Sequence, residues 1–192
     1  MGKGRLEAFS DGVIAIIITI MVLELKVPHG DDLNSLKPIL PVFLSYILSF
    51  INIALYWNNH HHMMFAVHHI NGRVLWANTH LLFWLSLIPF GTAWMGENHF
   101  TTWPIALYGI ILLMAGIAYY ILAHTLMRLH GRDSTLARAL GKDQKGIISV
   151  VIYAVAVPVA FLHSGVSLTM YAMVAAMWLI PDRRIEKTIG KD

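Results

Sequence analysis

Long runs of apolar residues, each bounded by charged or turn-forming residues, dominate the hydrophobic pattern of this chain. A bilayer core of about 30 Å takes roughly 20 apolar residues in helical conformation, so runs of about this length indicate membrane-spanning helices. Six such runs are present, at residues 6–27, 39–57, 74–95, 104–127, 146–163 and 166–180. The pattern therefore predicts an all-α integral membrane protein whose residues 1–192 form one six-helix transmembrane domain.

The basic residues fall almost entirely on one side of this predicted topology. Of the 14 Lys and Arg residues, only Lys26 and Lys37 lie in outer segments when the N-terminus is placed inside. The inner ones are Lys3, Arg5, Arg73, Arg128, Arg132, Arg138, Lys142, Lys145, Arg183, Arg184, Lys187 and Lys191. Because loops rich in Lys and Arg stay cytoplasmic, both termini are predicted to be cytoplasmic.

Composition supports a membrane protein over a soluble one. The chain is 57% hydrophobic and only 13% charged, whereas a soluble domain carries roughly 25% charged residues. The absence of cysteine excludes a disulfide-stapled module, and a net charge of +3 is small for a nucleic-acid-binding protein. The expected surroundings are a lipid bilayer, with no nucleic-acid partner.

Charged residues of the membrane layer are concentrated on the first predicted span. Asp11 lies within it, and a charge in hydrocarbon costs at least about 2.5 kcal/mol. On a helix turning about 100° per residue, Ile16, Ile20 and Leu23 form an apolar stripe, and Asp11 points about 140° away from Ile16. Such a stripe most often faces lipid or a neighbouring helix. We expect the Asp11 carboxylate to bind other helices of its own subunit, with direct ion contact as the alternative.

The beginning of this span carries a recognisable motif. Residues 5–11 read R-x-x-x-F-S-D, with Arg5, Phe9, Ser10 and Asp11 at the fixed positions, and this resembles the signature of the transmembrane protein 175 family of potassium channels. The similarity extends over residues 16–25 of the first span and to the six-span length. It also includes Tyr56-Trp57 with the histidines that follow, and Trp76 with Asn78.

The resemblance implies a bacterial family member located as a multi-pass protein in the plasma membrane. Such members assemble as homotetramers in which the first helices line a central pore, and they conduct potassium passively. The family's pore positions can be transferred to this sequence by their distance from F-S-D. The main constriction then falls on Ile16, further rings fall on Ile20 and Leu23, and Thr19 is a neighbouring hydroxyl. Rings of apolar side chains close a pore because water leaves a narrow hydrophobic constriction readily. No cofactor is implied beyond permeant potassium ions.

Histidines cluster where the second span ends. His60, His61, His62, His68 and His69 could suggest a metal site. However, no Asp or Glu occurs between Asp32 and Glu97, and cysteine is absent, so such a site lacks its usual carboxylate partners. We favour a structural role, in which His60 and His61, with Trp57 and Asn78, supply hydrogen bonds to Arg5, Ser10 and Asp11.

Three other functions are alternatives to a potassium channel. An enzyme is disfavoured because no acid–base pair or activated nucleophile lies within the predicted spans. A secondary transporter is a better rival, although such proteins usually contain inverted repeats and broken helices that this sequence does not show. A proton-permeable channel is the third alternative. Uncoupled flux down an ion gradient would distinguish a channel from a transporter.

Overall fold

The computed structural model describes residues 2–131, 134–140 and 143–179, and in these residues the secondary structure is helical apart from one bridge between Gly2 and His69. The elements in chain order are α1 (Gly4–Ile20), η1 (Met21–Glu24), η2 (Leu33–Ile39), α2 (Leu40–Phe65), α3 (Gly72–Ser86), α4 (Ile88–Glu97), α5 (Thr102–His130), α6 (Thr135–Leu140), α7 (Gln144–Val159) and α8 (Ser164–Leu179). The helices labelled η are of the tighter 3₁₀ type.

The helical segments overlie the apolar runs of the sequence. Four continuous segments are long and apolar enough to cross a membrane, namely Gly4–Glu24, Leu33–Phe65, Gly72–Glu97 and Thr102–His130. Helices α7 and α8 are apolar but have only 16 residues each, so the predicted count of six spans is not settled by length. Six of the basic residues used to predict orientation, together with the end of the last run, lie outside the described residues: Arg132, Lys142, Ile180, Arg183, Arg184, Lys187 and Lys191.

The third apolar run differs from the prediction because it is not one uninterrupted helix. It is divided at Leu87 into α3 and α4, and Pro89 lies in the first turn of α4. Proline has no backbone N–H and its ring collides with the carbonyl four residues earlier, so a helix readily restarts at this position. A second difference is α6, a short helix inside the predicted polar connection between the fourth and fifth runs.

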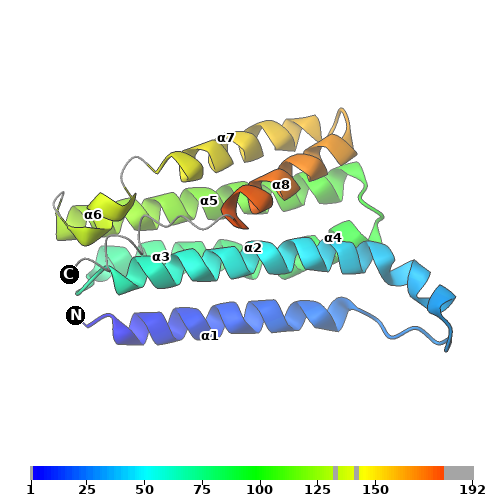
Figure 1. Ribbon diagram of the computed structural model, residues 1–192, viewed down its shortest axis with the longest axis horizontal. Helices are drawn as coiled ribbons and strands as arrows, with labels where there is room; N and C mark the ends of the chain where they lie inside the picture. Colours follow the sequence, from blue (N-terminus) through cyan, green and yellow to red (C-terminus); the bar gives the residue numbers. More distant parts are fainter. Residues whose placement is uncertain (1, 132–133, 141–142, 180–192) are drawn as a thin grey trace.

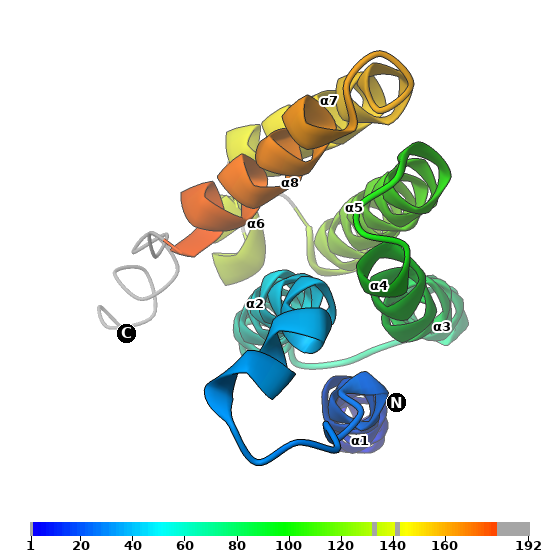
Figure 2. The ribbon, with the colours of Figure 1, turned by 90° about the vertical axis from the view of Figure 1, so that its right-hand side faces the viewer.

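The long helices run side by side along the longest axis of the molecule (Figure 1). Helix α1 begins at the end of the bundle where α2 and α5 finish. Figure 2, looking along the bundle, shows α1 at the periphery next to α2 and α3, with the α7–α8 hairpin on the opposite side. Helix α1 therefore packs directly on α2 and α3, and α2 separates it from the α7–α8 hairpin.

A line of polar side chains runs along the face of α2 that points into the bundle. Ser45, Ser49 and Asn52 are buried there. The Ser49 hydroxyl lies 2.6 Å from the hydroxyl of Thr92 on α4 and 2.9 Å from that of Tyr108 on α5. Because polar groups inside a membrane protein must find partners within the protein, these contacts fix how α2, α4 and α5 align.

Close backbone packing joins α2 to α4 at Gly96. A methyl group on Gly96 would lie 2.7 Å from the Cα atom of Val42 and 3.2 Å from its backbone nitrogen. The backbone of a helix cannot rotate away as a side chain can, so only glycine fits here.

Replacing Gly96 with alanine should therefore separate α2 from α4. Overpacking of this kind costs about 1–3 kcal/mol, and each kcal/mol lowers the melting temperature of a chain of this size by roughly 2–4 °C. Thermal unfolding of the purified protein in detergent measures the effect. Gly72→Ala is the matched control, because a methyl group there meets no atom within 4 Å. Equal melting temperatures for the two variants would contradict the close contact.

Candidate functional site

Helix α1 has one covered face and one uncovered face. The covered face packs on α2, α3 and α4, and its buried residues recur at helical spacing. They are Leu6, Ser10, Ile14 and Ile17, followed by Met21 in η1. The opposite face is covered by no element of the described residues, so an apolar surface of the first helix remains open.

The predicted stripe lies on this open face. Ile16, Ile20 and Leu23 are 61%, 41% and 76% exposed. Phe9 is exposed on the same side, and a methyl group on Gly12 would meet nothing within 4 Å. Phe9, Ile16 and Ile20 therefore share the exposed face that the helical wheel groups together, and Leu23 lies beyond the end of the α-helix, in η1.

Thr19 lies next to the stripe, and its hydroxyl is used by its own helix. The Thr19 side chain is exposed, and its Oγ1 atom lies 2.9 Å from the backbone carbonyl of Ala15 and 3.0 Å from that of Ile16. The single hydroxyl proton is directed to the backbone. Toward the open face, Thr19 can therefore act only as an acceptor through its oxygen lone pairs.

A chain of hydrogen bonds joins the motif to α2 and α3. The Ser10 hydroxyl donates to the carbonyl of Leu6 (2.8 Å) and accepts from the Asn78 amide nitrogen on α3 (2.9 Å). The Asn78 oxygen lies 2.8 Å from Nε2 of His60 on α2. Ser10, Asn78 and His60 are all buried, so three helices are connected through groups that have no access to solvent.

The direction of these bonds fixes the tautomer of His60. Because the Asn78 nitrogen donates to Ser10, the Asn78 oxygen must accept, and His60 must carry its proton on Nε2. Nδ1 of His60 is buried and has no hydrogen-bond partner among the described residues. His60 is thus held as a donor toward α3 by a single bond.

The motif carboxylate is bound by the second helix. Asp11 is partly buried, and its Oδ1 atom accepts a hydrogen bond of 3.0 Å from the indole nitrogen of Trp57. This contact directs the carboxylate toward α2, on the side of α1 away from Ile16. The arrangement is the intrasubunit contact expected from the sequence.

Two motif-related residues differ from the prediction. His61 makes no hydrogen bond in the part of the chain that the structure describes, and its ring instead stacks on Trp57 with centroids 5.7 Å apart. The reason is angular, because His61 is about 100° around α2 from His60 and one helical turn beyond Trp57. The exposed side chain of Arg5 has no hydrogen bond or ion pair with another described residue.

The remaining histidines form contacts at the end of the bundle. The backbone N–H of His68 donates to Nε2 of His130 (3.3 Å), and the rings of His69 and His130 lie 4.5 Å apart. Among the described residues, no group of three or more His, Cys, Asp or Glu side chains could hold a metal ion.

Sequence reasoning missed a tether at the start of α1. The Lys3 ammonium group donates to the carbonyl of Met64 at the end of α2 (2.5 Å), and Gly2 pairs with His69. Cations near the carboxyl end of a helix are favourable because its last carbonyls lack partners. No local sequence signal indicates which helix end Lys3 reaches, since the two residues are 61 positions apart.

Comparisons with known proteins place this geometry in context. The family model described as endosomal/lysosomal potassium channel TMEM175 matches residues 5–89. A protein named as a potassium channel from Chryseobacterium sp. (strain P1-3) is 54% identical over the full length of both chains. The chain is also similar to a crystal structure of a lysosomal potassium-selective channel TMEM175 homolog from Chamaesiphon minutus. The TM-score is 0.81 at 28% identity, covering 94% of this chain and 97% of the other.

An animal protein matches over a shorter region. The endosomal/lysosomal proton channel TMEM175 of Gallus gallus is 38% identical over 79 residues, which is 35% of this chain and 16% of the animal protein.

The bond between His60 and Asn78 can be tested with a double-mutant cycle. Asn78→Leu should cost about 1–3 kcal/mol because the buried His60 donor loses its only partner. The double variant His60→Leu/Asn78→Leu removes donor and acceptor together, so it should be more stable than the sum of the single changes predicts. Thermal unfolding in detergent provides the measurement. Additive losses would show that the two side chains do not interact.

Proposed function

Because the chain belongs to the TMEM175 family, we propose that it is a potassium channel that conducts ions passively across the bacterial plasma membrane. It is a multi-pass membrane protein, and the relatives reported above are named as channels. In the proposed channel each subunit is a single six-span domain with cytoplasmic termini, and permeant potassium ions are its only ligand. The observation that carries the proposal is the open apolar stripe on α1, opposite the polar contacts of the motif.

The proposed pore forms where four α1 helices meet in a homotetramer. Helix α1 lies at the periphery of its bundle (Figure 2), and its stripe is exposed, with no helix of the described residues covering it. A fourfold axis next to α1 would bring together four copies of Ile16, Ile20 and Leu23. The absence of a side chain at Gly12 allows the helices to approach closely one turn before Ile16.

The stripe residues would then form three apolar rings. Ile16 and Ile20 are four residues apart on an α-helix, which places their rings about 6 Å apart along the axis. Side chains of this size would leave a narrow, dry constriction when closed, and a dry constriction stops ions without a plug. We propose Ile16 as the main constriction and Thr19 as the neighbouring hydroxyl.

In this proposal the motif holds the pore helix in place and does not bind the ion. Asp11 is bound to Trp57 and Ser10 to Asn78, on the side of α1 away from the stripe. Arg5 is the exposed charged member of the motif. It therefore has the freedom to contact a neighbouring subunit.

Proton permeation and coupled transport are the alternatives. The animal proton channel supports the first, but it matches only 79 residues of this chain, whereas the full-length relative is named as a potassium channel. A transporter would saturate and require a coupling ion. Potassium flux into proteoliposomes without a proton or sodium gradient distinguishes the channel from both.

Assembly is the first test. Native mass spectrometry in mild detergent should detect four copies of the chain, because the α1 stripe has no partner in the part of the subunit that the structure describes. A stable monomer or dimer that still conducts potassium would contradict a pore formed by four first helices.

The constriction is the second test. Ile16→Asn keeps much of the side-chain volume but hydrates the ring, so single-channel conductance should rise and the preference for potassium over sodium should fall. Every 1.4 kcal/mol removed from the barrier raises the rate about tenfold. Planar-bilayer recording with potassium and sodium on opposite sides provides the measurement.

Ile110→Asn on α5 is the matched control for this change. Ile110 is 40% exposed, close to Ile20 in exposure, but lies on a helix that is not part of the stripe. Ile14 is unsuitable as a control because it is buried and asparagine there would disturb the core. Equal conductance changes at positions 16 and 110, or none at 16, would mean that the stripe faces lipid.

A further inference from the structure

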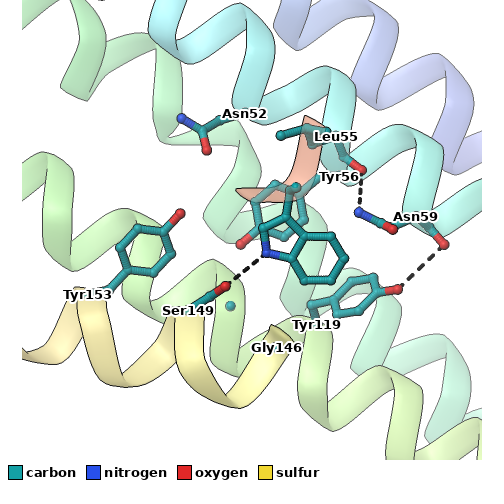
Figure 3. A pocket seen from close by; sticks show the side chains of 10 residues that line it. Asn52, Leu55, Tyr56, Asn59, Tyr119, Gly146, Ser149 and Tyr153 are labelled. Atoms are coloured by element: carbon teal, nitrogen blue, oxygen red, sulfur yellow. Dashed lines mark hydrogen bonds between the residues drawn. The ribbon is translucent and has the colours of Figure 1, made fainter. Parts of the chain in front are cut away.

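A cavity lies inside the subunit, away from the open face of α1. It is lined by α2, α5, α7 and α8 and is partly open to the outside, and Figure 3 shows its lining from close by. The side chains that define it are largely aromatic or amide groups: Asn52, Tyr56, Tyr119, Ser149, Tyr153 and Trp178. None of the residues that line it is acidic, basic or a histidine.

The size of the cavity limits its occupant. Its volume is about 50 Å³. A water molecule needs roughly 10–15 Å³ measured in this way, so the space fits about three to five waters or one molecule of similar size. A lipid, a sterol or a drug-sized aromatic compound is therefore too large to fit wholly within it.

Two hydroxyl groups at the cavity lack partners. Tyr153 is only 3% exposed, and neither its hydroxyl nor that of Tyr56 has a hydrogen-bond partner in the described parts of the chain. Neither hydroxyl is among the fully buried polar atoms without partners, so both open onto the cavity and offer hydrogen-bonding positions to a polar occupant.

An acceptor faces the same space. The Asn52 amide nitrogen donates to the carbonyl of Leu48 (3.0 Å), which leaves the amide oxygen available. In Figure 3 the Asn52 oxygen and the Tyr153 hydroxyl both point into the space between α2 and α7.

The other polar groups of the lining are already bound. The Trp178 indole nitrogen donates to the Ser149 hydroxyl (2.8 Å), and that hydroxyl donates to the carbonyl of Lys145 (2.8 Å). The Tyr119 hydroxyl reaches the carbonyl of Asn59 at 3.5 Å. The Asn59 amide nitrogen donates to the carbonyl of Leu55 (2.8 Å), which leaves its amide oxygen available. The unmet hydrogen-bonding capacity is therefore at Asn52, Asn59, Tyr56 and Tyr153.

We propose that this cavity is a binding site for small neutral alcohols of about three to five non-hydrogen atoms. The uncharged lining selects a neutral molecule, because nothing in it compensates an ionic charge. A hydroxyl group both donates and accepts, which matches the Asn52 oxygen and the tyrosine hydroxyls, while the aromatic rings contact the alkyl chain. Such an alcohol can replace water while the hydrogen bonds of the lining are kept, so the apolar part of the alcohol adds affinity.

A series of straight-chain alcohols distinguishes this site from the bilayer. Binding to the full-length protein in nanodiscs is measured by saturation-transfer NMR, with empty nanodiscs subtracted. Affinity for the cavity should rise from methanol to about butanol and fall from hexanol onward, with dissociation constants on the order of millimolar. Partitioning into lipid instead rises about fourfold with every CH₂ group. A steady rise through octanol would overturn the proposal.

Two variants locate the site. Tyr153→Phe keeps the ring and removes one unpaired hydroxyl, so propanol should bind about three- to tenfold more weakly. Tyr120→Phe is the matched control, since Tyr120 is 39% exposed on α5 and does not line the cavity. Unchanged binding in Tyr153→Phe, or equal loss in both variants, would overturn the site.

Gly116→Ala tests the size of the cavity independently of its hydrogen bonds. The added methyl group would lie 3.8 Å from the Tyr56 hydroxyl and 3.3 Å from a methyl of Val150, which narrows the space. The longest alcohol that binds well should become shorter by about one carbon. If the longest alcohol that binds well stays the same, the cavity does not limit the length of the alcohol. Binding is measured directly, so these results do not depend on whether the pore conducts potassium.

Discussion

The hydrogen bonds from Ser10 and Asp11 to α3 and α2 determine which side of α1 remains open. A helix in an apolar layer can rotate about its axis at little cost when its contacts are only apolar, because lipid and leucine are similar surroundings. The Ser10–Asn78–His60 chain and the Asp11–Trp57 bond remove this freedom, since rotation would leave buried polar groups without partners. The open stripe of Ile16 and Ile20 is a consequence of these bonds, although none of the bonded atoms lies on it.

Helix α2 carries two polar systems on different faces. Trp57 and His60 face α1 and α3, whereas Ser49 and Asn52 face α4 and α5. Because α2 is one rigid helix, the position of α1 is tied to the inner bundle without direct contact between the two polar systems. The cavity lies on the inner side of α2. Its occupant is therefore separated from the α1 interface by the thickness of α2.

Much of this arrangement could be predicted from the sequence, and the failures have physical causes. Helix positions followed from the apolar runs, and the direction of Asp11 followed from the wheel, because periodicity fixes which residues share a face of one helix. Periodicity does not fix which residue of another helix lies opposite. For this reason His60 could not be separated from His61, and the partner of Lys3 could not be predicted.

The end of the stripe follows a geometry that an ideal α-helix does not give. Leu23 lies in η1, whose 3₁₀ turns have three residues and rise about 2 Å per residue. Side chains three apart in such a turn eclipse each other, so Leu23 lies directly beyond Ile20 where an α-helix would rotate it by about 60°. In the proposed pore this would stack the last two rings in line, about 6 Å apart. The ion pair of Lys26 with Glu97 (3.2 Å) joins the segment after η1 to α4, but it is exposed and adds little stability. The alignment of Leu23 with Ile20 therefore depends on the tightened turn itself.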